Sequence, residues 1–96
     1  MIHEHAVIEV QPGREEEFEA VFGQVPAIFA QAAGCHGVEL RRCVEEPSRF
    51  VLLVAWETLE DHTVGFRESP LFGEWRGLVG GFFATPPQVR HYAVVA

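Results

Sequence analysis

His62 is the residue whose type and position best fit proton-transfer chemistry. A histidine side chain has an unperturbed pKa near 6.5, so it gains and loses a proton readily near neutral pH. The spacing of the segment predicts a helix whose inner face carries Leu59, His62, Thr63 and Phe66. A histidine at the edge of a core can also simply bind a backbone carbonyl. Both interpretations of His62 stay open at this point.

Aromatic side chains form the second set of candidates, because they can wall a pocket for an aromatic ligand. Trp56 ends a predicted strand, where its ring could stack on a substrate while its indole N–H donates a hydrogen bond. Plain core packing is the alternative for this residue. The other aromatic candidates for a pocket lining are Phe22, Phe66, Phe72 and Trp75. Aromatic residues at helical spacing are more often core residues, so these four carry both interpretations as well.

Arg67 and His91 are the polar candidates near these aromatic residues. Arg67 could hold an anionic oxygen, but it follows the inward-facing Phe66 by one residue and so is expected to point sideways or outward. A surface ion pair is its alternative role, with Glu60, Glu68 or Glu74. His91 and Tyr92 are neighbours in a predicted strand and therefore face opposite sides of it. The sequence does not decide which of the two reaches a cavity.

The short motif His3-Glu4-His5 places two imidazoles on one face of a predicted strand. Metal sites use this spacing, but they need at least a third ligand. Only a histidine distant in the sequence could supply that ligand. We therefore predict no metal site.

Period-two and period-3.6 patterns predict the elements that position these residues. Strands are expected at 2–10, 37–44, 49–57 and 88–95. A helical stripe runs from Phe18 to Ala32, with a kink expected at Pro26 and an end at Gly34. A second helical region begins at Thr58 with an acidic capping box, and a helix restarts at 69–70 and ends at 80–81.

The order strand, helix, strand, strand, helix, strand is that of the ferredoxin-like split βαβ arrangement (βαββαβ). We therefore predict one α+β domain over residues 1–96, with a four-stranded antiparallel sheet and both helical segments on one face. The strand at 49–57 is apolar on both sides: Phe50, Leu52, Val54 and Trp56 face one way, and Val51, Leu53 and Ala55 face the other. A second copy of the sheet would cover that second face, so we predict a homodimer.

Composition excludes several classes of protein. Hydrophobic residues make up 48% of the chain, which excludes a disordered protein. The net charge is −7 and the chain has no lysine, which argues against binding to nucleic acid or to an anionic membrane surface. No stretch resembles a signal peptide or a membrane span, so a cytoplasmic protein is expected.

Several segments, in order, resemble the antibiotic biosynthesis monooxygenase domain family. They are AVIEVQPGREEEF at 6–18, RFVL at 49–52, WET at 56–58 with His62, FRESPLF at 66–72, and His91-Tyr92. The resemblance implies a dimeric α+β barrel, in agreement with the two-sided strand. Many members of the family oxidise phenolic or quinol-type aromatics with O₂ and without a metal, flavin or haem.

The resemblance therefore implies a cofactor-independent monooxygenase that acts on a small electron-rich aromatic molecule and O₂. His62 would abstract a proton, Trp56 would pack against the ring, and the other aromatic residues with Arg67 and His91 would bind substrate. Haem-degrading members use an asparagine on the first strand, whereas this chain has no asparagine and places Ala6 near that position. Haem degradation is therefore disfavoured.

Two alternatives remain: a non-catalytic barrel that binds a small ligand or serves in assembly, and an isomerase on the same scaffold. The size of the interior cavity distinguishes a non-catalytic barrel from an enzyme. A void of roughly 300 Å³ or more with His62 at its wall would favour ligand chemistry. An interior filled by aromatic side chains would favour a structural role.

Overall fold

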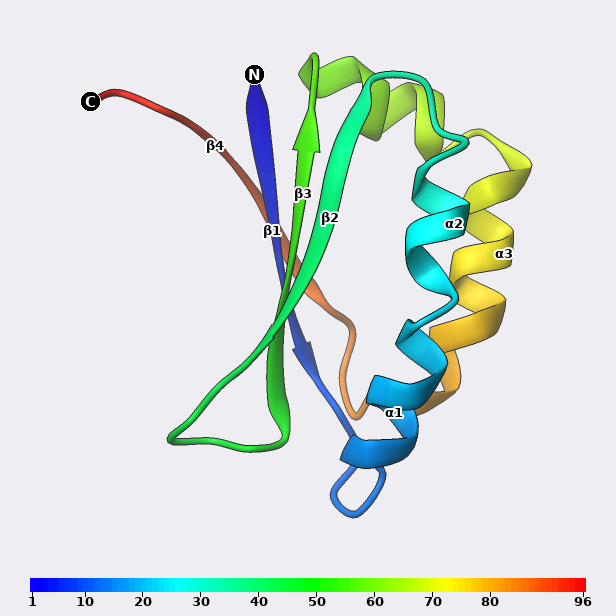
Figure 1. Cartoon of the computed structure of the whole chain (residues 1–96), viewed down its shortest axis with the longest axis vertical. Coiled ribbons are helices and arrows are strands. Elements are labelled where there is room, and N and C mark those ends of the chain that lie inside the picture. Colours follow the sequence, from blue (N-terminus) through cyan, green and yellow to red (C-terminus); the bar gives the residue numbers. More distant parts are fainter.

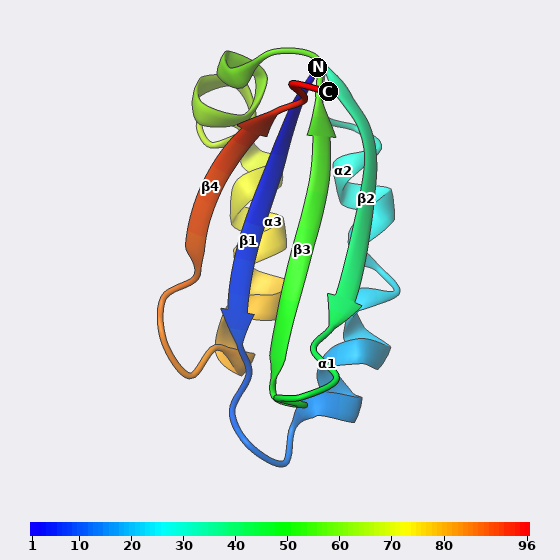
Figure 2. The same cartoon turned by 90° about the vertical axis from the view of Figure 1, so that its left-hand side faces the viewer.

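Four antiparallel strands form one sheet in the computed structural model, which describes all residues 1–96. The strands are β1 (Ile2–Glu9), β2 (Cys35–Arg42), β3 (Arg49–Trp56) and β4 (Gln88–Ala93), and they lie side by side in the order β2-β3-β1-β4. Figure 2 shows this order across the open face of the sheet. The predicted ferredoxin-like arrangement is confirmed, with strand ends that differ from the predicted ones by one or two residues.

The helical segments cover only one face of the sheet (Figure 1). They are α1 (Glu15–Phe22), α2 (Val25–Phe29), the π-helix η1 (Asp61–Phe66), α3 (Pro70–Val79) and the short 3₁₀ segment η2 (Gly80–Phe82). As predicted, Ser69 caps α3, because its hydroxyl accepts a hydrogen bond from the Leu71 N–H while Pro70 occupies the first turn. The other face of the sheet has no helix over it.

The predicted kinked helix, whose apolar stripe runs from Phe18 to Ala32, is instead two helices separated by Gly23 and Gln24. Pro26 lies in the first turn of α2, where its missing N–H removes no intrahelical hydrogen bond. The chain therefore restarts a helix at Pro26 instead of bending one there. The apolar stripe is preserved across the break, and its buried members are Phe18, Phe22, Val25, Phe29 and Ala32.

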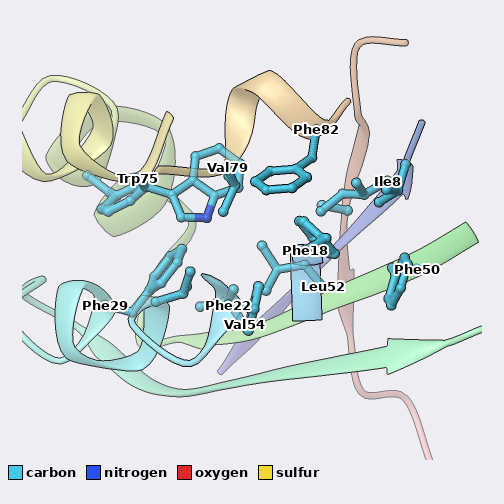
Figure 3. Close-up of a cluster of buried hydrophobic side chains, with 14 of the residues drawn as sticks. Ile8, Phe18, Phe22, Phe29, Phe50, Leu52, Val54, Trp75, Val79 and Phe82 are labelled. Atoms are coloured by element: carbon cyan, nitrogen blue, oxygen red, sulfur yellow. The ribbon is translucent and has the colours of Figure 1, made fainter. Parts of the chain in front are cut away.

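The core lies between the helices and the inner face of the sheet (Figure 3). Phe18 contacts Phe50 and Phe82 in edge-on geometry, with ring centroids 5.0 and 5.7 Å apart. Edge-on aromatic pairs contribute about 0.5–1.5 kcal/mol beyond their buried area. This end of the core is filled by packing alone, which leaves the opposite end, around Trp56, for polar groups.

Strand β3 is buried on one side and half-buried on the other. Its inward residues are fully covered by the helices, as predicted: Phe50, Leu52, Val54 and Trp56. Its outward residues keep part of their surface exposed in the single chain: Val51, Leu53 and Ala55. The apolar outer face of β3 is thus present but uncovered.

A capping box holds the start of the segment that carries His62. The Thr58 N–H donates to Asp61 Oδ2 at 3.1 Å, and the Asp61 N–H donates to Thr58 Oγ1 at 3.2 Å, as the acidic capping box predicted. One expectation was wrong: Leu59 is 39% exposed and does not share the inner face. The segment winds as a π-helix, so the inward positions are His62 and Phe66.

Replacing Gly34 by alanine is expected to destabilise the fold more than the same change at Gly13. Both glycines have a left-handed φ, +81° and +91°, which costs other residues about 1–2 kcal/mol. Only at Gly34 does an added Cβ also collide with the Asp61 side chain, while nothing lies within 4 Å of it at Gly13. Urea unfolding of the two variants measures the difference. Equal losses in free energy of unfolding would contradict the packing of Gly34 against Asp61.

Candidate functional site

Four polar side chains from four different elements meet at one end of the core. The Trp56 indole N–H donates to Glu4 Oε1 at 3.0 Å. His62 Nε2 lies 3.4 Å from the same oxygen, and His62 Nδ1 lies 2.7 Å from His91 Nε2. We call Glu4, Trp56, His62 and His91 the polar cluster.

Strand register brings these residues together. Side chains alternate along a strand, so Glu4 shares the inner face of β1 with Ala6 and Ile8. Glu4 is paired directly with His91 on β4, and its other neighbour on β3 is Val54, two residues before Trp56. The sheet therefore fixes three members of the polar cluster on one face.

The fourth member, His62, comes from η1. The Arg67 N–H donates to the His62 carbonyl at 3.2 Å, which is the five-residue hydrogen-bond spacing of a π-helix. Such turns are rare and occur often at functional sites. The His62 ring is stacked on Trp56, with centroids 5.3 Å apart and planes 12° apart. The stacking and the two polar contacts hold the imidazole in one orientation.

A cavity of about 210 Å³ opens beside the polar cluster. Its wall contains Glu4, Phe29, His62, Phe66, Arg67, Phe72, Trp75, Arg76, Pro86, Pro87 and Val89. The volume is smaller than the roughly 300 Å³ that we expected for ligand chemistry. A void of about 150 Å³ is nevertheless enough to bind benzene, so this cavity has room for one aromatic ring.

The aromatic part of the wall is closely packed. Phe66 stacks on Phe29 at 4.9 Å and meets Phe72 edge-on at 5.9 Å. Trp75 is edge-on to Phe29, and its buried indole N–H has no hydrogen-bond partner. The cavity therefore combines apolar ring surfaces with the carboxyl and imidazole groups of Glu4 and His62.

Burial shifts the pKa values of the cluster toward the neutral forms. Burial, the nearby Arg67 charge and His91 lower the pKa of His62 to about 4. Burial raises the pKa of Glu4, although the Trp56 hydrogen bond and Arg67 act in the opposite direction. Burial, with Arg67, also lowers the pKa of His91. At neutral pH His62 is therefore an uncharged imidazole.

The structure brings most of the predicted site residues together. His62, Arg67, Phe66, Phe72 and Trp75 line the cavity, whereas His91 does not line it and contacts His62 instead. Arg67 is exposed and makes none of the surface ion pairs that were its alternative role.

Like His91, Phe22 and Trp56 are predicted site residues that do not line the cavity. Phe22 packs in the core, 5.9 Å from Phe18, and does not reach the cavity. Trp56 is completely buried and lies behind the wall, where it contacts Glu4 and His62 and not the open volume. It therefore acts on the site through the residues that it holds.

Glu4 is the main residue that the sequence analysis missed. It is only 4% exposed, which is unusual for a carboxylate. The alternation of β1 contained the signal, since Glu4 shares its face with Ala6 and Ile8, while His3 and His5 face the other way. Neither of these histidines belongs to a group of three side chains that could hold a metal ion.

Comparisons with known proteins agree with this fold. The sequence model of the family "Antibiotic biosynthesis monooxygenase" matches residues 1–78. The uncharacterized protein YczJ of Bacillus subtilis is 41% identical over 92 residues, which span 96% of this chain and 97% of YczJ. The chain therefore belongs to the antibiotic biosynthesis monooxygenase family. The match ends before β4, so the His91-Tyr92 part of the resemblance lies outside it.

Solved structures show the same architecture. A Bordetella bronchiseptica protein assigned to antibiotic biosynthesis monooxygenases has 54% identity and a TM-score of 0.96, covering 99% of this chain and 97% of its own. The monooxygenase ActVA-Orf6 of Streptomyces coelicolor, solved in complex with nanaomycin D, has 16% identity and a TM-score of 0.82, covering 99% and 88%. At that identity the second likeness concerns the fold alone. None of the helices in our structure is long and apolar enough to span a membrane.

The buried neutral His62 is expected to make stability fall as the pH falls from about 6.5 to 4. Because its pKa is about 4 in the folded state and near 6.5 when unfolded, the unfolded chain binds more protons in this window. The loss is on the order of 2 kcal/mol, since the neighbouring cavity admits some water. Urea unfolding of wild type and His62→Gln at fixed protein concentration, from pH 4 to 7, measures it. A pH slope unchanged in the variant would contradict this burial.

Proposed function

We propose that this protein is a cofactor-independent monooxygenase that oxidises a small, single-ring hydroquinone or polyphenol with O₂. The observation that carries the proposal is the polar cluster at the wall of an aromatic cavity of about 210 Å³. A phenolic hydroxyl placed there meets a group that can take its proton, and the ring meets Phe66, Phe72 and Trp75. Family membership supports the reaction type.

The chemistry needs only a base, a dry pocket and the two reactants. Loss of the hydroxyl proton leaves an electron-rich phenolate, which transfers one electron to O₂. The resulting radical pair joins at a ring carbon, and water is then lost. For hydroquinone the balance is C₆H₆O₂ + O₂ → C₆H₄O₃ + H₂O, so one oxygen atom enters the ring, the other leaves as water, and the substrate supplies all four electrons.

The charge of Arg67 favours these reaction steps. Arg67 is a positive charge at the cavity wall, close enough to influence the pKa values of Glu4, His62 and His91. A cation at that position stabilises a phenolate as it forms. The aromatic wall keeps much of the bulk water away from the reduced oxygen species.

Metal-stripped protein is expected to consume oxygen with methylhydroquinone faster than the protein-free solution, and to place one atom from ¹⁸O₂ in the product. A two-ring hydroquinone should react more slowly, because the cavity accommodates one ring. Val89→Phe, which fills the cavity, should abolish most of the uptake. Val44→Phe, at a site that is 89% exposed and is not part of the cavity lining, is the matched control.

An oxygen uptake no higher than the protein-free rate would refute the enzymatic proposal. Binding of phenol without turnover would instead favour the non-catalytic ligand-binding barrel. Uptake that Val89→Phe leaves intact would show that the reaction takes place outside this cavity.

We further propose that two copies of the chain pair through the open faces of their sheets. On that face Val7 is paired with Val51 and His5 with Leu53, which makes a strip of partly exposed apolar surface along the middle of the sheet. Figure 2 looks directly onto this uncovered face. Full burial of a valine or leucine side chain is worth about 1.5–3 kcal/mol, so a second sheet gains free energy by covering them.

Leu53→Arg is expected to convert the dimer to a monomer at micromolar concentration, measured by sedimentation. The new charge lies opposite Glu39 on β2, a favourable cross-strand pair, so the single chain should remain folded. Val44→Arg adds the same charge on an exposed residue after β2 and should leave the mass unchanged. A wild-type protein that sediments as a monomer would refute the pairing.

A further inference from the structure

We propose that the free carboxylate oxygen of Glu4, and not an imidazole nitrogen of His62, takes the proton from the bound phenol. The inference rests on the function proposed above and assigns its base. In the transfer the substrate O–H bond breaks, an O–H bond forms at Glu4 Oε2, and a phenolate remains in the cavity. Trp56, His62 and His91 then serve as positioning residues.

The two oxygens of Glu4 have different surroundings. Both polar contacts of the side chain, from the Trp56 indole N–H and from His62 Nε2, are made to Oε1. Oε2 makes no hydrogen bond. Trp75 Nε1 is the only fully buried side-chain nitrogen or oxygen without a hydrogen-bond partner, so Oε2 cannot be fully buried. Oε2 is therefore accessible, and because Glu4 lines the cavity, it is available to a ligand there.

Both nitrogens of His62, in contrast, lie next to polar groups of the protein. Nδ1 lies 2.7 Å from His91 Nε2, so one of the two imidazoles donates to the other. With Glu4 ionised, the favoured tautomers have the His91 Nε2–H donating to His62 Nδ1 and the His62 proton on Nε2, which lies 3.4 Å from the carboxylate oxygen Glu4 Oε1. In this tautomer His62 has no lone pair left for a substrate proton. His62 therefore acts on the substrate only through Glu4.

The surroundings of Glu4 suit a general base. Burial raises the pKa of Glu4, which makes its carboxylate a stronger base than an exposed one, whereas the pKa of His62 falls to about 4 and leaves a weak base. The titratable and charged groups around Glu4 come from several elements. They are Cys35 on β2, His62 on η1, Arg67 after η1, Arg76 on α3 and His91 on β4.

The pH dependence of kcat/KM with methylhydroquinone distinguishes the two bases. The wild-type pH profile of kcat/KM should have an ascending limb, in which activity rises as Glu4 loses its proton. Glu4→Gln keeps the size of the side chain but removes its basicity, so kcat/KM should fall about 100-fold or more and the limb should disappear. His62→Gln should lower kcat by about tenfold and keep the limb at a shifted pH. Glu60 is an exposed carboxylate directly before η1, so Glu60→Gln should change neither kcat/KM nor its dependence on pH.

A Glu4→Gln variant that retains wild-type kcat/KM and its limb would overturn the assignment, as would a His62→Gln variant that alone loses the limb. Should Glu4→Gln fail to fold, ¹³C NMR of the wild-type Glu4 carboxyl provides an independent test. Phenol, which serves here as a probe that is not turned over, should shift that resonance and its titration curve. Bound phenol that leaves the Glu4 resonance unchanged would refute the proposal.

These measurements separate failure of the inference from failure of the proposed function. If wild type consumes oxygen and Glu4→Gln does so equally well, the monooxygenase proposal stands and the base is a different group. If wild type consumes no oxygen but phenol perturbs the Glu4 resonance, the cavity and its acceptor are as described and the oxygen chemistry is wrong.

Discussion

Burial of the Glu4 carboxyl is the constraint on which the rest of the site depends. A buried carboxyl costs free energy unless hydrogen-bond donors replace the water that it has lost. One oxygen accepts a hydrogen bond from Trp56 at the end of β3 and lies 3.4 Å from the imidazole nitrogen Nε2 of His62 in η1. The sheet register and the position of η1 must therefore both be correct before this carboxyl is satisfied. The same requirement fixes which oxygen remains open to the cavity.

The fold separates the part of the molecule that provides stability from the part that provides chemistry. Around Phe18 the core is entirely apolar, with edge-on ring contacts to Phe50 and Phe82. Around Trp56 the same sheet face changes to a carboxyl group, two imidazoles and a cavity. A void and a polar cluster both weaken packing, and close packing at the other end offsets that loss. The π-helical turn at His62 belongs to the end with the polar groups.

Sequence patterns were sufficient to predict the architecture, because the spacing of apolar and capping residues along the chain identifies helices, strands and their ends. The order of elements, the Ser69 cap, the Thr58–Asp61 capping box and the two-sided strand all follow from local spacing. The wider turn of η1 did not follow, because a π-helix has no distinctive spacing, and this put Leu59 on the wrong face. The contact between His62 and His91 also required the pairing of β4 with β1, which no local pattern specifies.

Only part of the site lies in the segment of the chain that the family model matches. Glu4, Trp56 and His62 lie within residues 1–78, the range that the family model matches. Three further lining residues lie beyond that range: Pro86 and Pro87 on the segment that leads into β4, and Val89 in β4 itself. Two consecutive prolines restrict the backbone before β4, so this wall is stiff and its distance from Phe66 and Phe72 sets the room for a ring. Separate parts of the chain thus provide the acid–base groups and limit the size of the substrate. Strand β4 connects the two parts, because it carries both Val89 at the cavity wall and His91 in the polar cluster.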